Sequence, residues 1–198
     1  MSTRLVSSRL LCAALLVALA PFAAAQQSPV AAGQERDAAQ GKEYREYEVK
    51  AAYLLQFLRY VTWPKRADDD KAPLVIGVVG KSPFGKVFDS VDGKEVEGTG
   101  RKLKVKKFDV APKDAELRAC HIVFVCKSEQ PHLEELLAAV ADHPVLTVTE
   151  GDRMIERGVA FGFVLEERKV RIEYNSEATQ RAKLKVSAQL QRVVVRRL

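Results

Sequence analysis

A glycine-containing stretch after an apolar run has the spacing of a phosphate-binding loop. Gly80 is followed by four residues and then by Gly85 and Lys86. In working loops the residue after the lysine is Ser or Thr, whose hydroxyl holds the magnesium ion. Val87 stands at that position, and its side chain cannot bind a cation. The stretch therefore predicts a turn between a strand and a helix rather than a nucleotide site.

The histidines and serines form no recognisable catalytic or metal-binding pattern. His121, His132 and His143 fall on different predicted elements, and no pair has His-x3-His spacing. A zinc site needs three or four convergent ligands. The chain also lacks the Gly-x-Ser-x-Gly turn of the α/β-hydrolases. The acidic run 68–70 is interpreted as a solvated loop. We therefore expect a protein that is not an enzyme and that holds no metal and no cofactor.

The cysteines argue against a disulfide within the domain. Cys120 and Cys126 lie at the two ends of an apolar run that predicts a buried strand. Six residues of strand separate their Cα atoms by about 20 Å, whereas a disulfide needs about 7 Å or less. The favoured interpretation is two small buried hydrophobic residues. A crosslink to another chain and an exposed redox thiol remain open.

Composition and the first residues indicate an exported protein with one domain. The chain has 198 residues, 47% hydrophobic and 29% charged, with a formal net charge of +6, and such a mild surplus does not argue for nucleic acid. Residues 1–25 combine Arg4 and Arg9, an apolar run and an Ala-x-Ala end, which is typical of a signal peptide. We expect cleavage near Ala25, a flexible leader over 26–42 and one domain over 43–198, which would place the protein in the periplasm.

The hydrophobic pattern predicts alternating helices and strands. A helix is expected over Glu43–Trp63, with an apolar stripe that includes Val49, Tyr53 and Phe57. The other elements expected are strands at 73–80, 102–108 (at a sheet edge), 120–126 and 144–149, short helices at 84–91 and 130–141 (the second capped by Ser128), a hairpin of 159–165 with 170–174, and a helical tail capped by Ser176. This order favours an α/β, three-layer sandwich: a mostly parallel central sheet, an antiparallel hairpin at one side and flanking helices.

Two surface candidates could bind a partner. The lysine-rich run 101–107 would suit an acidic partner, although lysines on an edge strand also prevent sheets from pairing edge to edge. The hairpin carries Phe161, Phe163, Ile172 and Tyr174. These aromatic and apolar residues would either pack in the core or anchor a partner, since aromatic residues dominate interface energetics.

Four segments, taken in order, resemble the YfiR/HmsC-like family of periplasmic proteins. They are V-K-A-A-Y-L-L-Q-F at 49–57 with Trp63-Pro64, I-G-V-V-G at 76–80 with S-P-F-G at 82–85, C-H-I-V-F at 120–124, and V-L-T-V at 145–148 continuing through the hairpin to V-R-I-E-Y-N at 170–175 and 182–187. The resemblance extends from about Tyr44 to Val194. The sequence departs from the family at Arg157-Gly158, where Gly-Gly is usual, and at Lys183, where glycine is frequent. It also lacks the cysteines that pair in well-studied relatives, so redox control is not expected.

The resemblance implies a non-catalytic regulator and its partners. Such a protein would bind the periplasmic domain of an inner-membrane signalling protein, a diguanylate cyclase or a sensor kinase, and repress it. An outer-membrane lipoprotein would relieve the repression, which raises cyclic di-GMP and promotes biofilm formation. The resemblance also implies a homodimer. We expect Phe161, Phe163, Glu173 and Leu184 to contact the partner. The alternatives are a periplasmic small-ligand-binding protein, with its pocket at the carboxyl ends of the strands, and an unrecognised enzyme.

Overall fold

The computed structural model describes the backbone of residues 29–64 and 72–198 and the side chains of residues 45–64 and 72–198. The expected signal peptide and the acidic run 68–70 lie outside these ranges. The elements are α1 (Pro29–Tyr60), β1 (Val61–Thr62), β2 (Leu74–Val79), η1 (Phe88–Ser90), β3 (Glu95–Val96), β4 (Arg101–Phe108), α2 (Asp114–Arg118), β5 (Ile122–Val125), η2 (Lys127–His132), α3 (Leu133–Ala139), β6 (Leu146–Glu150), η3 (Met154–Arg157), β7 (Phe161–Glu166), β8 (Lys169–Tyr174), α4 (Ser176–Arg181), β9 (Lys185–Val186), α5 (Ala188–Gln191) and β10 (Val194–Arg197).

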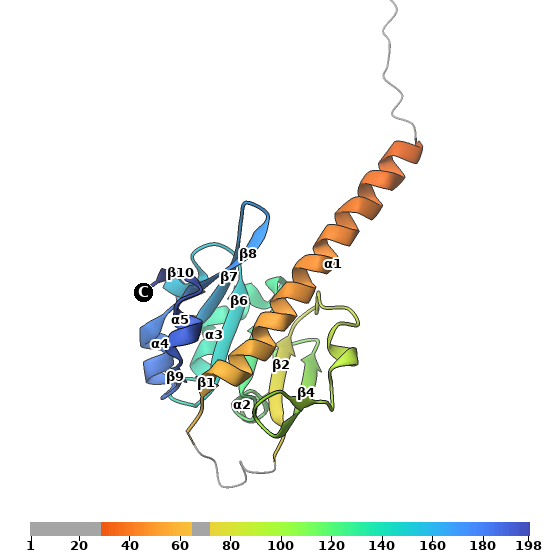
Figure 1. Cartoon of the computed structure of the whole chain (residues 1–198). Coiled ribbons are helices and arrows are strands. Elements are labelled where there is room, and N and C mark those ends of the chain that lie inside the picture. The colour runs from red at the N-terminus through yellow and green to blue at the C-terminus, as the bar shows by residue number, and fades with distance from the viewer. Residues whose placement is uncertain (1–28, 65–71) are drawn as a thin grey trace, which may run out of the picture.

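The strands form one eight-stranded sheet in the order β10-β8-β7-β6-β5-β2-β4-β3, and β1 pairs with β9 in a separate two-stranded sheet. Every pairing from β4 through β2, β5 and β6 to β7 is parallel, whereas β7 and β8 form an antiparallel hairpin. Helices cover the sheet, and α1 runs across it and continues beyond it (Figure 1). The predicted mostly parallel α/β sheet with an antiparallel hairpin is confirmed.

Helix α1 covers one face of the sheet with a stripe that shares Phe57 with the predicted one but differs from it at other positions. Its buried hydrophobic residues are Tyr47, Ala51, Leu54, Phe57, Leu58 and, just beyond the helix, Val61. The Phe57 ring stacks on Phe161 with centroids 4.6 Å apart. The predicted Val49 is instead 44% exposed. The helix also begins at Pro29, well before the expected start at Glu43. The buried face is therefore rotated, and it leaves apolar residues of α1 facing outward.

The opposite face of the sheet is covered by α2, α3 and η3. Leu133 and Leu136 of α3 pack there with Leu117 and with side chains of β5. Because side chains alternate along a strand, Phe124 faces α1 while Val123 and Val125 face α3. These two apolar clusters, one on each face, make the three layers.

Several expected elements differ from the structure. The tail from Ser176 is not one helix: α4 ends at Arg181, and a Lys183 φ of +56° sends the chain into β9. The valine-rich end then forms β10, consistent with the strand preference of β-branched residues. The residue that caps α4 is Asn175, whose side chain accepts the Ala178 N–H at 3.0 Å.

Two further local predictions are wrong. Ser128 does not cap a helix: its hydroxyl accepts the Lys81 N–H at 2.9 Å, and Cys126 precedes η2. Residues 84–91 contain only η1 in place of the expected short helix. The predicted edge position of the lysine-rich strand is correct for most of its length, because β3 pairs only with Arg101 and Lys102, and residues 104–108 of β4 pair with no described strand other than β2. The strands β2, β5 and β6 and the hairpin formed by β7 and β8 agree with the prediction.

Candidate functional site

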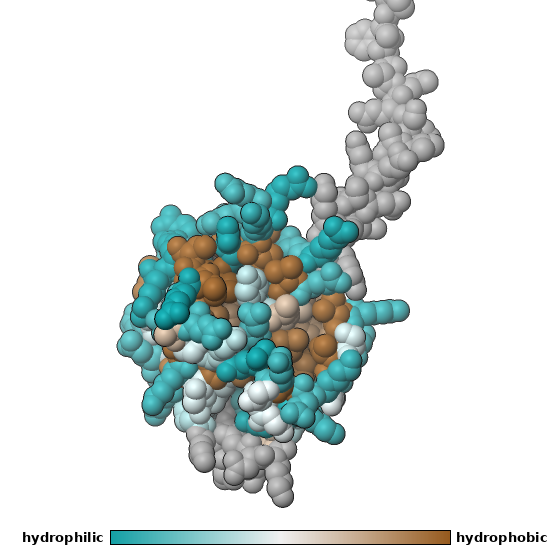
Figure 2. Space-filling model, viewed as in Figure 1, coloured by the Kyte–Doolittle hydropathy of each residue, from teal (hydrophilic) through white to brown (hydrophobic). Residues whose placement is uncertain are grey.

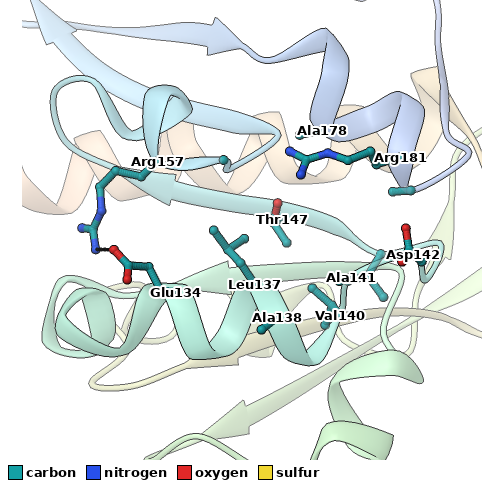
Figure 3. A pocket seen from close by; sticks show the side chains of 13 residues that line it. Glu134, Leu137, Ala138, Val140, Ala141, Asp142, Thr147, Arg157, Ala178 and Arg181 are labelled. Atoms are coloured by element: carbon teal, nitrogen blue, oxygen red, sulfur yellow. Dashed lines mark ion pairs between the residues drawn. The ribbon is translucent and has the colours of Figure 1, made fainter.

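Two cavities lie on different faces of the molecule. The larger, about 860 Å³, lies between α1 and the hairpin formed by β7 and β8, and we call it the α1–hairpin groove. The smaller, about 480 Å³, lies between α3 and α4 (Figure 3). Cavities of about 300–1,000 Å³ are typical of ligand sites. The α1–hairpin groove is the candidate site for the partner because it combines exposed apolar side chains with charge.

The α1–hairpin groove has an apolar surface and a basic rim. Its apolar lining is Val49 and Tyr53 of α1 with Leu165 and Val170 of the hairpin. Val49 is 44% and Leu165 52% exposed. Around them lie five basic residues and one acidic residue: Arg45, Lys127, Arg168, Lys169, Arg171 and Glu46. Figure 2 shows hydrophobic atoms on this face of the molecule between projecting hydrophilic side chains. The groove therefore suits an apolar partner segment with negative charge.

One basic side chain in this groove carries an unused donor. The Arg171 Nε is buried and has no hydrogen-bond partner among the described residues. A buried donor that bonds neither protein nor water costs roughly 1–3 kcal/mol. A partner carboxylate or carbonyl oxygen in the groove would remove that cost.

The hairpin wall ends in a strained two-residue turn. Glu166 pairs with Lys169, so Glu167 and Arg168 form the turn. Their φ angles are +48° and +64°. Such turns favour Asn-Gly because both residues must adopt the left-handed conformation. A glutamate and an arginine there carry backbone strain, of the kind that concentrates at functional sites.

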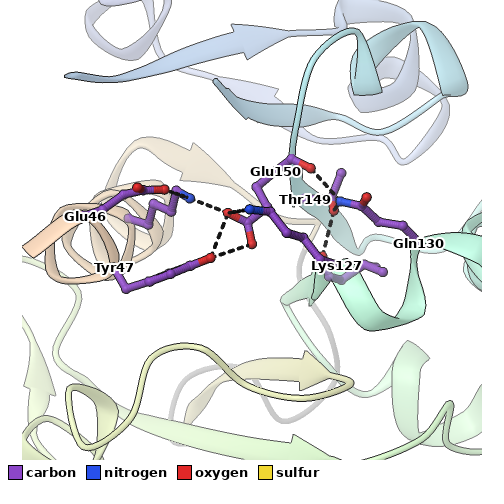
Figure 4. Close-up of polar contacts among 8 residues, drawn as sticks. Glu46, Tyr47, Lys127, Gln130, Thr149 and Glu150 are labelled. Atoms are coloured by element: carbon purple, nitrogen blue, oxygen red, sulfur yellow. Dashed lines mark hydrogen bonds and ion pairs between the residues drawn. The ribbon is translucent and has the colours of Figure 1, made fainter. Parts of the chain in front are cut away.

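A buried ion pair lies beneath the groove (Figure 4). Lys50 of α1 pairs with Glu150 at the end of β6, and both side chains are 2% exposed. The Tyr47 hydroxyl donates to the two Glu150 carboxylate oxygens at 2.9 and 3.1 Å. Glu46 also pairs with Lys50, and Lys127 lies 3.9 Å from Glu150. These contacts fix α1 to the carboxyl end of the sheet and so fix one wall of the groove.

The backbone at the end of β6 is held by a further set of hydrogen bonds. Gln130 Nε2 donates to the Glu150 carbonyl oxygen at 2.5 Å and to Thr149 Oγ1 at 3.2 Å. Thr149 Oγ1 in turn donates to the Val125 carbonyl oxygen at 2.6 Å. The carboxyl ends of β5 and β6 are therefore joined by side chains, which makes this end of the sheet a rigid support for the groove.

The four residues predicted to contact a partner are all buried. Phe161, Phe163 and Leu184 belong to the apolar cluster under α1, at 0%, 1% and 5% exposure. Glu173 is 6% exposed, and its Oε1 accepts from Arg196 at 3.4 Å. Of the two interpretations of the aromatic residues in the hairpin, packing in the core is therefore the correct one. Sequence reasoning missed Leu165, Lys169 and Val170. Leu165 and Val170 lie on the same face of the hairpin as the buried Phe163 and Ile172, two residues nearer the turn on each strand, and this shared face was the available signal.

Cys120 and Cys126 are buried and are not joined to each other by a disulfide, in agreement with the favoured interpretation. Burial, with smaller contributions from the negative charges of Glu150 and Glu129, raises the pKa of the Cys126 thiol to about 12. The Cys120 thiol donates to the Glu116 carbonyl oxygen at 3.3 Å. An exposed redox thiol at either position is contradicted by this burial.

Some other residues that the sequence singled out are either buried or paired with nearby side chains. His121 is 3% exposed, and its Nδ1 accepts the Val75 N–H at 3.1 Å. Lys104 and Lys107 pair with Asp92 and Asp89 at 3.2 and 2.8 Å. No cluster of three or more potential metal ligands occurs among residues 45–64 and 72–198. Within the same part of the chain, no helix is long and apolar enough to cross a membrane.

Two solved structures are among those that resemble this chain. A conserved domain protein from Vibrio cholerae O1 biovar El Tor is 10% identical, with a TM-score of 0.49 over 77% of this chain and 60% of that one. An ABC domain in complex with L-Trp from Streptococcus pneumonia is 9% identical, with a TM-score of 0.45 over 63% and 55%. This chain thus spans less than two thirds of either, and neither likeness is close enough to support an argument.

Comparison of sequences identifies the family. No curated protein sequence matches this chain. The sequence profile of the YfiR/HmsC-like family matches residues 47–194. These residues include the sheet from β2 to the start of β10, the hairpin, and the groove-lining residues of α1 from Tyr47 onward. The chain therefore belongs to the YfiR/HmsC-like family, whose members are in general periplasmic regulators rather than enzymes.

Proposed function

We propose that this protein is a non-catalytic periplasmic regulator that binds and represses a membrane-bound signalling enzyme, a diguanylate cyclase or a sensor kinase. The observation that carries the proposal is the family match over residues 47–194. By this proposal the protein affects cyclic di-GMP signalling and biofilm formation, and an outer-membrane lipoprotein could compete for it. It would act as a homodimer and would contact the periplasmic domain of its partner.

The α1–hairpin groove supports the proposal as the contact surface. Leu165 and Val49 are exposed apolar residues that a partner could cover. Arg168 and Lys169 lie beside them and would attract an acidic segment. The buried Phe161, Phe163, Glu173 and Leu184 would then act indirectly, by holding the hairpin and the tail in place. In this proposal the partner contacts the α1–hairpin groove directly, and not the four buried residues that the sequence suggested.

Repression follows from a difference in affinity. A regulator that binds the inactive state of a sensor domain more tightly than the active state shifts the balance toward the inactive state. To move an equilibrium from about 1:99 to 99:1, the preference must reach about 10⁴-fold, or roughly 5.5 kcal/mol. Burial of a few apolar side chains together with one or two desolvated ion pairs can supply an energy of this size.

The experiment is a complementation of the deleted gene. Cyclic di-GMP, or the phosphorylated output of a neighbouring kinase, is measured in the deletion strain carrying the wild type, Leu165→Asp or Val110→Asp. Val110 is 71% exposed and lies outside the groove, so it is the matched control. The wild type and Val110→Asp should restore the low signal, and Leu165→Asp should not. A deletion that leaves both outputs unchanged would refute the proposal.

A small-ligand-binding protein remains the alternative function. The observation that favours it is the volume of about 860 Å³ whose lining includes Lys127, just after β5, and Leu165, near the carboxyl end of β7. Open α/β sheets commonly bind ligands at the carboxyl ends of their strands. A screen of thermal stability with periplasmic metabolites separates the two functions. A saturable shift with one metabolite, together with unchanged signalling outputs in the deletion strain, would favour the alternative.

A further inference from the structure

The smaller cavity, between α3 and α4, plays no part in the proposed function and lies on the face of the sheet opposite α1. Its apolar walls come from Leu137 and Val140 of the α3 region and from Ala178 and Ala182 of the α4 region (Figure 3). Thr147 of β6 lies at its base. Its volume of about 480 Å³ is enough for a small organic molecule.

The charges around this cavity fall into two groups. At one end Arg157 lies 3.8 Å from Glu134 and also donates to the Gln130 carbonyl oxygen at 3.3 Å. At the other end are Arg181 and Asp142. No ion pair joins Arg181 to Asp142 or to any other acidic side chain in the described part of the chain. Arg181 therefore offers a guanidinium group that pairs with no carboxylate of the described residues.

Thr147 provides a second unused donor. Its side chain is 6% exposed, and its Oγ1 accepts the Ala160 N–H at 3.0 Å. A hydroxyl can accept and donate at once, and no described residue accepts the Thr147 proton. Figure 3 shows the Thr147 oxygen on the side that faces α4 and Arg181. The base and the mouth of the cavity thus each present a donor toward the same space.

We infer that this cavity binds a small monocarboxylate with a branched apolar body. The carboxylate would accept from the Arg181 guanidinium and the Thr147 hydroxyl, and the apolar body would cover Leu137 and Val140. Guanidinium groups bind carboxylates with charge-assisted hydrogen bonds. Asp142 at the rim disfavours a dianion such as phosphate, because each added negative charge increases the repulsion.

The test uses the purified protein with 4-methylpentanoate as the probe and 4-methylpentanamide as its uncharged counterpart. Binding is followed by NMR chemical shifts of backbone amides. The acid should give saturable shifts centred on Thr147 and Leu137, and the amide should bind more weakly. Arg181→Gln should weaken binding of the acid about tenfold or more, because it removes a hydrogen bond to a charged group. Arg192→Gln, an exposed arginine outside the cavity, is the matched control and should leave the affinity unchanged.

Three further variants separate binding from folding. Thr147→Ser keeps the hydroxyl and should retain most of the affinity, whereas Thr147→Val should lose affinity. Asp142→Asn should bind the acid at least as tightly as the wild type, because it removes a negative charge from the rim. The inference is overturned if 4-methylpentanoate gives no saturable shifts, if the amide binds equally well, or if Arg181→Gln behaves as Arg192→Gln does. None of these outcomes bears on the proposed regulation through the α1–hairpin groove.

Discussion

Lys50 and Glu150, one hundred residues apart in the chain, form an ion pair in which each side chain is 2% exposed. The pair joins α1 to the carboxyl end of β6, directly beneath the α1–hairpin groove. The Lys50 ammonium also lies 4.4 Å from the centre of the Tyr47 ring. The position of α1, and with it one wall of the groove, therefore depends on a buried electrostatic contact as well as on apolar packing.

Replacement of Lys50 alone should destabilise the protein strongly. Lys50→Met leaves Glu150 buried without its main cation, and loss of one partner of a buried pair costs about 3–5 kcal/mol. The double variant Lys50→Met/Glu150→Leu should recover most of that loss, because it removes both charges. Urea unfolding of the wild type, both single variants and the double variant measures the coupling. Equal stabilities of Lys50→Met and the wild type would show that the pair does not hold α1.

Relief of strain at the hairpin tip should stabilise the fold. Glu167 has a φ of +48°, and asparagine adopts this conformation more readily than glutamate. We expect Glu167→Asn to raise the free energy of unfolding by about 0.5–1 kcal/mol. Glu166→Asn is the control, because Glu166 lies in the extended strand β7 and should gain nothing. If both variants change the thermal midpoint equally, backbone strain at Glu167 is not the cause.

The thiols should react only after unfolding. The Cys126 pKa of about 12 means that the folded protein holds the unreactive thiol at pH 9. In the unfolded chain the thiol ionises near pH 8.5. The contribution of Cys126 to stability is therefore complete below about pH 8.5 and decreases as the pH rises toward 12.

Alkylation at pH 9, with mass spectrometry to assign the modified residue, measures this protection. Modification of Cys126 should be slow in buffer and fast in concentrated urea. Rapid modification of Cys126 without denaturant would contradict the burial described above.

A charge on the hairpin surface should abolish repression without loss of stability. Leu165 is 52% exposed, so Leu165→Asp should change the free energy of unfolding by about 0.5 kcal/mol or less. Phe163→Asp would place a carboxylate in the core, since Phe163 is 1% exposed, and should prevent folding. The thermal midpoints of both variants and the abundance of each in the cell distinguish these effects. If the Leu165→Asp protein fails to accumulate in the cell, the loss of repression comes from instability and not from the loss of a contact in the groove.

The strongest sequence signals were the apolar runs that form central strands. β2 and β5 are buried on both faces, so each is a short continuous apolar segment in the sequence. β6 is buried as well, but its apolar Leu146 and Val148 alternate with Thr147 and Thr149. The hairpin was predicted equally well because two β-rich runs flank a polar turn. The family resemblance, which rested on the order of these same segments, is confirmed by the match over residues 47–194.

The tail and the site depended on features without a clear local pattern. The chain turns at Lys183, which adopts the left-handed conformation. A lysine does not predict this conformation, and the only signal for it was that glycine is frequent at this position in the family. A partial signal for the Lys50–Glu150 pair was present in the sequence, because Lys50 lies among the buried residues of α1 and Glu150 is a charged residue at the end of a buried strand. Their contact arises from tertiary packing, which periodicity does not reveal.

The most direct test of the account is photo-crosslinking in living cells from position 165, with position 110 as the control. The account predicts that a crosslinking residue at 165 captures an inner-membrane protein that has a periplasmic domain and a cyclase or kinase domain, and that position 110 does not. Capture of the same protein from both positions, or of no signalling protein from position 165 while the chain is folded and exported, would contradict it.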